Sequence, residues 1–216
     1  MDSIKCFFVL SAFLMPHALA ASSTNRTVIF IFYETLPEQS LFIRGGLDTN
    51  LHSGCDTDEV TGDACAIPMR TRLLGTIDHY DGYNAWRAGD NFLDWHGAEA
   101  GQGSFYGAPA EGTPLVWTTS NILSPAYQEL NTFGDHYWMV DMEMDCPFVE
   151  ADGWFDVKGY TAPASFGWEP DVTQTACDGT IGGVSPHASV NHMARCGAVN
   201  IFEHGGSACT INAFED

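Results

Sequence analysis

The sequence has few basic residues and no hydrophobic run long enough to cross a membrane. Lysine and arginine number 8 against 28 aspartate and glutamate residues, so the formal net charge is −20. So acidic a chain repels polyanions, which excludes nucleic acid and an anionic membrane surface as partners. The acidic composition does not identify a substrate, because a need for solubility in a secreted protein explains the excess of carboxylates equally well.

The sequence also lacks the familiar catalytic motifs. It contains no Gly-x-Ser-x-Gly motif, phosphate loop or dinucleotide fingerprint. Its histidines never fall into a compact zinc-binding pattern, and His187 and His192 are the nearest pair. Paired carboxylates such as Asp94 and Glu99 could serve a glycosidase, but such pairs are expected by chance in this composition. The sequence therefore names no catalytic residue and leaves enzyme activity undecided.

Residues 1–20 have the pattern of a secretory signal peptide. Lys5 precedes a short apolar run, and small residues end at Ala20 as a cleavage site. We expect a secreted, extracellular protein with a single mature domain over residues 21–216. Asn25 opens an Asn-Arg-Thr glycosylation sequon and is therefore a predicted glycosylation site.

The cysteines that follow the signal peptide predict a disulfide framework. Removal of Cys6 with that peptide leaves six of the 7 cysteines, and an even number in a secreted chain predicts three disulfides. We expect Cys55 to pair with Cys65, because this bond closes a loop rich in glycine and aspartate between two apolar runs. The pairing is left open for Cys146, Cys177, Cys196 and Cys209.

The most regular pattern lies in residues 136–171. Apolar and acidic residues alternate from Tyr137 to Cys146, which predicts a β-strand with one buried face that includes Trp138. A second alternating run covers Trp154–Tyr160, and a short third piece covers Gly167–Asp171. The second run places on one face the side chains of Trp154, Asp156 and Lys158.

One face of the first run carries the three carboxylates of Asp141, Glu143 and Asp145. A cation would relieve the repulsion among them, so calcium is the only cofactor that the sequence suggests. A solvated acidic surface explains the same pattern without any metal.

The remaining apolar runs predict further short strands, whereas residues 76–133 show little periodicity. Their glycine, aspartate and aromatic content indicates a packed insertion with a few short strands, of which Leu115–Thr119 is the best example. Residues 177–192 look like a loop, and no clear amphipathic helix is present. Many short strands separated by turns predict an all-β, immunoglobulin-like β-sandwich with a long aromatic-rich insertion, stabilised by disulfides.

The order of these strands resembles a starch-binding domain. The matching pieces are Val28–Tyr33, Leu41–Gly46, Cys65–Met69, Tyr137–Asp145, Trp154–Tyr160 and Gly167–Asp171. The resemblance implies a sandwich that stacks glucose rings on tryptophan faces. It places Lys158 and Trp168 on the lysine and the second binding tryptophan of that family.

The chain departs from the starch-binding pattern where the family has its first binding tryptophan. The segment Cys55–Cys65 stands there and contains no tryptophan. A second aromatic platform would have to come from Trp86, Trp95 or Trp117 in the insertion. The complete set of expected ligand-binding residues is Trp86, Trp95, Trp154, Lys158 and Trp168.

A closer resemblance spans nearly the whole mature chain. The strings LFIRGG, CAIPM, GDNFLDW, GAEAGQG, GTPLVWTT, GDHYWM, MEMDC, GWFDVKGY and RCGAVNIF occur in the order typical of the extra C-terminal domain of some animal, notably mollusc, α-amylases. The resemblance implies a stand-alone secreted relative of that domain, without the amylase catalytic barrel.

Three functions remain as hypotheses. The first is a secreted protein that binds an α-glucan or related carbohydrate. The second is a secreted enzyme, or a photoprotein or luciferase-like protein, that holds a small aromatic molecule in the insertion. The third is an acidic, calcium-associated matrix protein.

Overall fold

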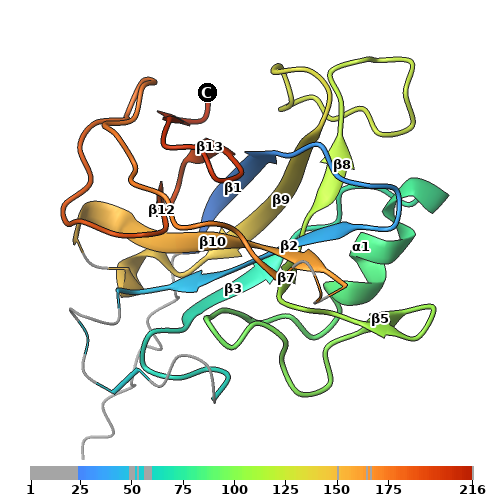
Figure 1. Ribbon diagram of the computed structural model, residues 1–216, viewed down its shortest axis with the longest axis horizontal. Helices are drawn as coiled ribbons and strands as arrows, with labels where there is room; N and C mark the ends of the chain where they lie inside the picture. The colour runs from blue at the N-terminus through green and yellow to red at the C-terminus, as the bar shows by residue number, and fades with distance from the viewer. Residues whose placement is uncertain are drawn as a thin grey trace, which may run out of the picture.

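The computed structural model describes residues 24–48, 52, 54–55, 60–149, 151–163, 165 and 167–215 (Figure 1). The signal peptide predicted for residues 1–20 lies outside the described residues. Within them, short strands form two main sheets that face each other across one core. No helix in these ranges has the length and hydrophobicity needed to cross a bilayer.

The first sheet is built around β1 and β9, the two longest strands in it. β1 pairs with β9 in an antiparallel manner and with β13 in parallel. β8 (Val116–Thr118) also pairs with β9. The strand order is β14 (Cys209–Asn212), β13 (Val199–Glu203), β1 (Asn25–Phe32), β9 (Tyr137–Met144), β3 (Ile67–Thr71) and β4 (Phe92–Leu93).

The second sheet is built around β10 and runs across the strands of the first sheet in Figure 1. Its strand order is β11 (Gly167–Trp168), β10 (Trp154–Ala162), β2 (Ser40–Gly46) and β7 (Thr113–Pro114), with β12 (His192–Arg195) also paired to β10. A small hairpin joins β5 (Ser104–Phe105) to β6 (Ala108–Pro109). This arrangement confirms the predicted all-β, disulfide-stabilised sandwich.

The segment 76–133 contributes to both sheets. It supplies β4 and β8 to the first sheet and β7 to the second. The strand predicted at Leu115–Thr119 is confirmed as β8. The segment also contains a short 3₁₀ turn, η1 (Asp78–Tyr80), and the helix α1 (Asp81–Trp86), which the sequence did not predict. A helix of 6 residues is too short to show a helical period.

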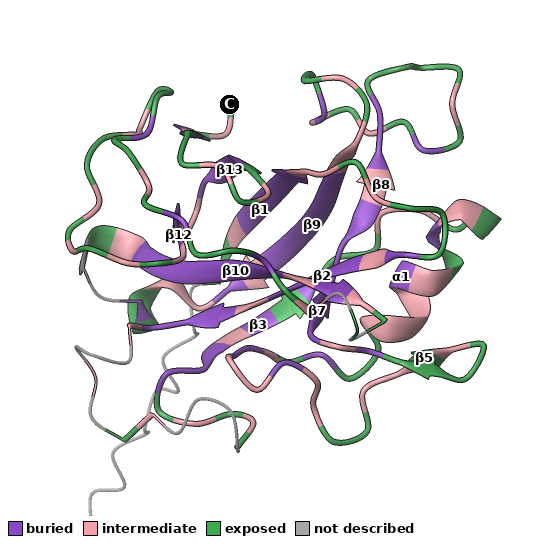
Figure 2. Cartoon of the chain, viewed as in Figure 1, coloured by how far each residue is buried: buried purple, intermediate pink, exposed green. Residues whose placement is uncertain are grey.

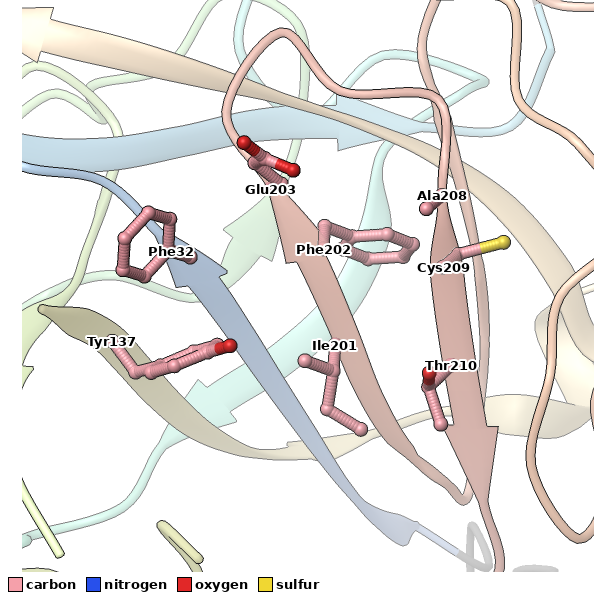
Figure 3. A pocket seen from close by; sticks show the side chains of 8 residues that line it. All are labelled: Phe32, Tyr137, Ile201, Phe202, Glu203, Ala208, Cys209 and Thr210. Carbon is pink, nitrogen blue, oxygen red and sulfur yellow. The ribbon is translucent and has the colours of Figure 1, made fainter. Parts of the chain in front are cut away.

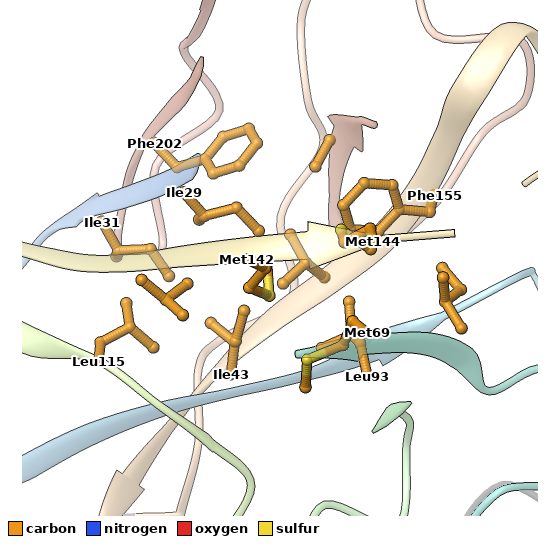
Figure 4. Packing of buried hydrophobic residues seen from close by; sticks show 14 of the residues in the cluster. Ile29, Ile31, Ile43, Met69, Leu93, Leu115, Met142, Met144, Phe155 and Phe202 are labelled. Carbon is orange, nitrogen blue, oxygen red and sulfur yellow. The ribbon is translucent and has the colours of Figure 1, made fainter. Parts of the chain in front are cut away.

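The core lies between the inner faces of the two sheets (Figure 4). Alternation along β9 directs Trp138, Val140, Met142 and Met144 into it, as predicted. Trp138 is 8% exposed, and its indole N–H donates to the Tyr33 carbonyl at 3.2 Å. Figure 2 shows the same pattern, with the long strands buried and the connecting loops exposed.

Three disulfides link the strands and loops. Cys55 pairs with Cys65, which confirms that prediction, and the other bonds are Cys146–Cys196 and Cys177–Cys209. The Cys146–Cys196 bond joins the end of β9 in the first sheet to the residue after β12 in the second. Three intact disulfides indicate an oxidising environment.

Two short 3₁₀ turns, η2 (Cys146–Phe148) and η3 (Ala151–Gly153), connect β9 to β10. The loop predicted for residues 177–192 ends where β12 begins, at His192. Alternation does not reveal this strand, because three of its four residues are buried.

Candidate functional site

Two of the predicted ligand-binding tryptophans lie together on the outer face of the second sheet. Trp168 belongs to β11 and is 41% exposed, and Trp95 follows β4 in a loop. Their ring centroids are 6.4 Å apart, with the planes inclined at 45°. The Tyr160 ring meets Trp168 edge-on at 5.1 Å. We call the surface formed by Arg44, Trp95, Tyr160 and Trp168 the tryptophan face.

Strand register explains why these side chains meet. Tyr160 of β10 lies opposite Trp168 of β11 and opposite Phe42 of β2. Directly opposed residues in an antiparallel pair point to the same side of a sheet. The inner positions of β10 are taken by Phe155 and Val157, so Tyr160 is directed outward.

Arg44 packs against two of the aromatic rings of the tryptophan face. Its guanidinium lies 3.8 Å from the Tyr160 ring centroid and 5.1 Å from that of Trp168. Its Nε donates to the Glu111 carbonyl at 2.7 Å, which fixes the orientation of the plane. Gly97 allows the Trp95 loop to approach, because a Cβ at Gly97 would lie 2.3 Å from Arg44 Nε and its φ is +97°.

An acidic pocket of about 320 Å³ adjoins the tryptophan face. Trp95 lines both, so the two features share a wall. The remaining lining residues of this acidic pocket are Asp48, Asp156 and residues 188–191.

Asp156 is the most deeply placed group of the acidic pocket, at 2% exposure. Its Oδ1 accepts hydrogen bonds from the Ser189 hydroxyl and from the Asn191 amide at 3.4 Å. Burial raises the pKa of Asp156, and the charge of Asp48 adds to this, while the two hydrogen bonds and His187 oppose it.

His187 completes a group of three metal-ligating side chains beside this pocket. Its Nε2 lies 3.0 Å from Asp48 Oδ2 and 3.6 Å from Asp156 Oδ2. Neither ring nitrogen of His187 makes a hydrogen bond within the described part of the chain, although both are shielded from solvent. One imidazole and two carboxylates in this arrangement could hold a divalent cation.

The other predicted ligand-binding residues are not on the tryptophan face. Trp154, expected among the ligand-binding residues, is 7% exposed and lies under the Arg195 guanidinium at 5.4 Å. Lys158 is also 7% exposed, since its ammonium group donates to Asp171 at 2.6 Å and to the Val190 carbonyl at 3.3 Å.

Trp86 is half-buried and fills a structural role. Its ring packs against Phe42 at 5.1 Å and Phe105 at 5.7 Å, and its indole N–H donates to the Ala108 carbonyl at 3.0 Å. These contacts tie α1 to the β5–β6 hairpin and to the second sheet.

The carboxylates of β9 pair with arginines. Asp141 accepts three hydrogen bonds from Arg26, and Glu143 contacts Arg72 at 2.6 Å. Arg26 of β1 and Arg72, which follows β3, therefore relieve the repulsion at two of the three carboxylates that suggested calcium.

The acid pair considered for a glycosidase also has structural partners. Asp94 accepts hydrogen bonds from the Thr61 hydroxyl and from the amides of Gly62 and Gly97. Glu99 accepts from the amides of Asn91 and Phe92. Both carboxylates therefore hold loops of the insertion in place.

Two of the further concavities bear on the functional hypotheses, and both lie away from the tryptophan face. One, of about 350 Å³, lies over β1, β9, β13 and β14 and is lined by Phe32, Tyr137 and Ile201, with Glu203 at its end (Figure 3). Burial and the charge of Glu203 raise the pKa of Tyr137. The other, of about 660 Å³, is formed by residues 76–79, 117 and 124–126 of the insertion.

The residues of the candidate site that sequence analysis did not predict to bind a ligand are Arg44, Asp48, Asp156 and His187. Alternation gave a weak indication for Asp156, because its position among core residues predicted that its side chain lies on the outer face of β10. Asp48 carried no signal, and His187 was noted only for its spacing from His192; 139 positions separate Asp48 from His187, and only the fold brings them together.

Comparison with known proteins adds no relative. A scan of protein-family models, a search of curated proteins and a search of solved structures each found no match to this chain. The function is therefore argued from the site itself.

Proposed function

We propose that this is a secreted protein that binds an α-glucan or related carbohydrate on the tryptophan face. The observation that carries the proposal is the pairing of the exposed Trp168 with the partly buried Trp95, whose ring centroids are 6.4 Å apart. Secretion is proposed from the signal peptide and fits the three disulfides.

The chemistry of the tryptophan face suits a sugar ring. A pyranose presents C–H groups on its flat side, and these pack favourably against an indole. Trp168 is the open platform, and Trp95 stands beside it at an angle of 45°, so a curved chain of sugars could contact both rings. The chain lacks the first tryptophan of the starch-binding pattern, and Trp95 of the insertion serves as the second aromatic platform in this proposal.

Polar groups next to the aromatic rings supply hydrogen bonds for sugar hydroxyls. Asp48 and Asn191 line the acidic pocket beside Trp95, and in addition to their contacts with His187 and Asp156 their carboxylate and amide groups can bond a sugar hydroxyl. Lys158 does not take part in this proposal, because Asp171 and a backbone carbonyl already engage its ammonium group.

Titration with maltoheptaose, followed by tryptophan fluorescence and calorimetry, tests the proposal. We expect saturable binding and a change in fluorescence. Replacement of Trp168 by alanine should weaken the sugar affinity about tenfold or more, because truncation of a central aromatic contact costs at least about 1.4 kcal/mol. Trp95→Phe should weaken it less, since an aromatic ring remains.

Tyr106→Ala is the matched control, because Tyr106 is 95% exposed and lies outside the tryptophan face. It should bind maltoheptaose as the wild type does. Absence of heat and of any fluorescence change at millimolar sugar would remove the carbohydrate proposal.

A small-molecule pocket in the insertion is the second candidate. The concavity beside His79 and Trp117 has about 660 Å³, within the range of ligand pockets. Its position agrees with the alternative of a small aromatic ligand held by the insertion, and it is the next site to test if sugar does not bind.

A further inference from the structure

We infer that Asp48, Asp156 and His187 form a binding site for a divalent transition-metal ion of the zinc class. The inference does not depend on carbohydrate binding, because it rests on the three ligating side chains and on the groups that orient them. These side chains come from the end of β2, from β10 and from the loop before β12, so the fold alone assembles the site.

The spacing of the ligating atoms fits a metal-centred arrangement. Zinc binds nitrogen and oxygen ligands at about 2.0–2.1 Å, so tetrahedral ligand atoms lie about 3.3 Å apart. His187 Nε2 is 3.0 Å and 3.6 Å from the two Asp Oδ2 atoms, and all three ligating atoms fall within 4.8 Å of one another. An ion could therefore enter with small side-chain adjustments.

The groups around Asp156 and His187 support the same conclusion. Ser189 and Asn191 both donate to Asp156 Oδ1, which leaves Oδ2 directed toward His187. Such outer hydrogen bonds are how metal-ligating carboxylates are oriented in proteins. The ring nitrogens of His187 are shielded and lack hydrogen bonds within the described ranges, so a metal would satisfy a buried lone pair.

The donor set selects the class of ion. Imidazole nitrogen favours zinc and its neighbours over calcium, which prefers six to eight oxygen ligands. Three protein ligands leave a coordination position open, and the adjoining acidic pocket of about 320 Å³ gives a ligand or water access to it. The side chains of Asp48 and Asp156 are 9% and 3% exposed, so two carboxylates lie close together with little water.

Zinc affinity of the full secreted protein tests the inference. Protein freed of metal by a chelator is titrated with Zn²⁺ in competition with a chromophoric chelator. We expect one tight equivalent, which His187→Gln should weaken more than about a hundredfold. Ser189→Ala should weaken it about 10–100-fold, as expected for a group that orients a ligand.

His79→Gln is the matched control, because His79 belongs to the pocket in the insertion. This variant should bind one equivalent of Zn²⁺ with the affinity of the wild type. The melting temperature should rise with Zn²⁺ in the wild type but not in His187→Gln. Asp156→Asn should also weaken the Zn²⁺ affinity, and if this variant does not fold, the His187 and Ser189 variants still decide the question.

Equal zinc affinity in the wild type and in His187→Gln would overturn the inference. Tight calcium binding that His187→Gln does not affect would also overturn it, because the site would then use carboxylates alone. Trp168→Ala should retain the zinc affinity, so failure of the carbohydrate proposal and failure of this one are distinguishable.

Discussion

Asp141 shows how a single carboxylate becomes structural when a neighbouring strand supplies its partner. It lies in the middle of β9, its side chain is 4% exposed, and it accepts hydrogen bonds from Arg26 at 3.1 Å and 2.7 Å. Arg72 approaches the same carboxylate at 3.7 Å. Two residues further along β9, Glu143 pairs with Arg72 in a much more exposed setting.

Replacement of Asp141 by asparagine should lower the free energy of unfolding by about 1.5–3 kcal/mol, because charge-assisted hydrogen bonds to a buried group are lost. The matched change Glu143→Gln should cost only about 0.2–1 kcal/mol, as for exposed ion pairs. Urea denaturation of the three proteins measures both. Equal losses would show that burial of Asp141 does not set its contribution.

At the scale of elements, the disulfides constrain loops of very different length. Cys146 and Cys196 are separated by 50 positions and join the two sheets, whereas Cys55 and Cys65 are separated by 10. A bond that closes a longer loop removes more entropy from the unfolded chain.

Removal of the Cys146–Cys196 bond by double alanine substitution should lower the stability by about 4 kcal/mol, against about 3 kcal/mol for the Cys55–Cys65 bond. Chemical denaturation of the two double variants measures the difference. A larger loss for the Cys55–Cys65 variant would contradict the loop-length argument and indicate that native packing at that loop dominates.

At the scale of the whole molecule, Glu169 joins the two sheets through a buried polar cluster. It accepts hydrogen bonds from Gly159 of β10 at 2.7 Å, from Gly205 after β13 at 2.5 Å, and contacts His192 at 2.9 Å. Burial alone would raise the pKa of Glu169, but His192 and the two backbone amides outweigh it and hold this pKa below its ordinary value.

The neighbouring His204 also belongs to this cluster. Its ring stacks on Tyr33 with centroids 3.9 Å apart, and burial lowers its pKa. His192 lowers this pKa further, whereas Glu169 opposes the shift. The folded protein therefore takes up a proton at His204 less readily than the unfolded chain does.

Both shifts predict that acidification destabilises the fold. A lowered histidine pKa removes stability as the pH falls below about 6.5, and a lowered glutamate pKa removes stability below about 4.3. Chemical denaturation between pH 7.5 and pH 3 should show these contributions as differences between the wild type and variants at His204 and Glu169, because the raised pKa values of Asp90 and Asp156 act in the opposite direction. His204→Gln should reduce the pH dependence of the free energy of unfolding near about pH 6.5. Glu169→Gln should reduce part of this pH dependence below about pH 4.3.

The exposed Glu38 provides a control for this series, because Glu38→Gln leaves the buried cluster intact. Its stability should follow the pH dependence of the wild type. An unchanged slope in His204→Gln between pH 7.5 and pH 5 would contradict the assignment of that range to His204.

Most of the fold follows from local sequence. Alternation in residues 137–144 and 154–160 is enough to predict β9 and β10, because a strand with one buried face repeats every two residues. An even number of cysteines predicts a disulfide framework, and a short intervening loop predicts the Cys55–Cys65 bond. These features depend on neighbours in the chain, so sequence alone determines them.

Contacts between distant segments needed the tertiary structure. Trp154 and Lys158 lie on the expected face of β10. In the folded protein, Arg195 lies over the Trp154 ring and Asp171 pairs with Lys158. These contacts join distant segments, so no local sequence pattern predicts them. The meeting of Trp95 with Trp168, and of Asp48 with His187, depends on how separate loops fold over the second sheet. The sequence therefore determined which chemical groups each strand and loop carries, whereas tertiary packing determined which of these side chains lie on the same surface.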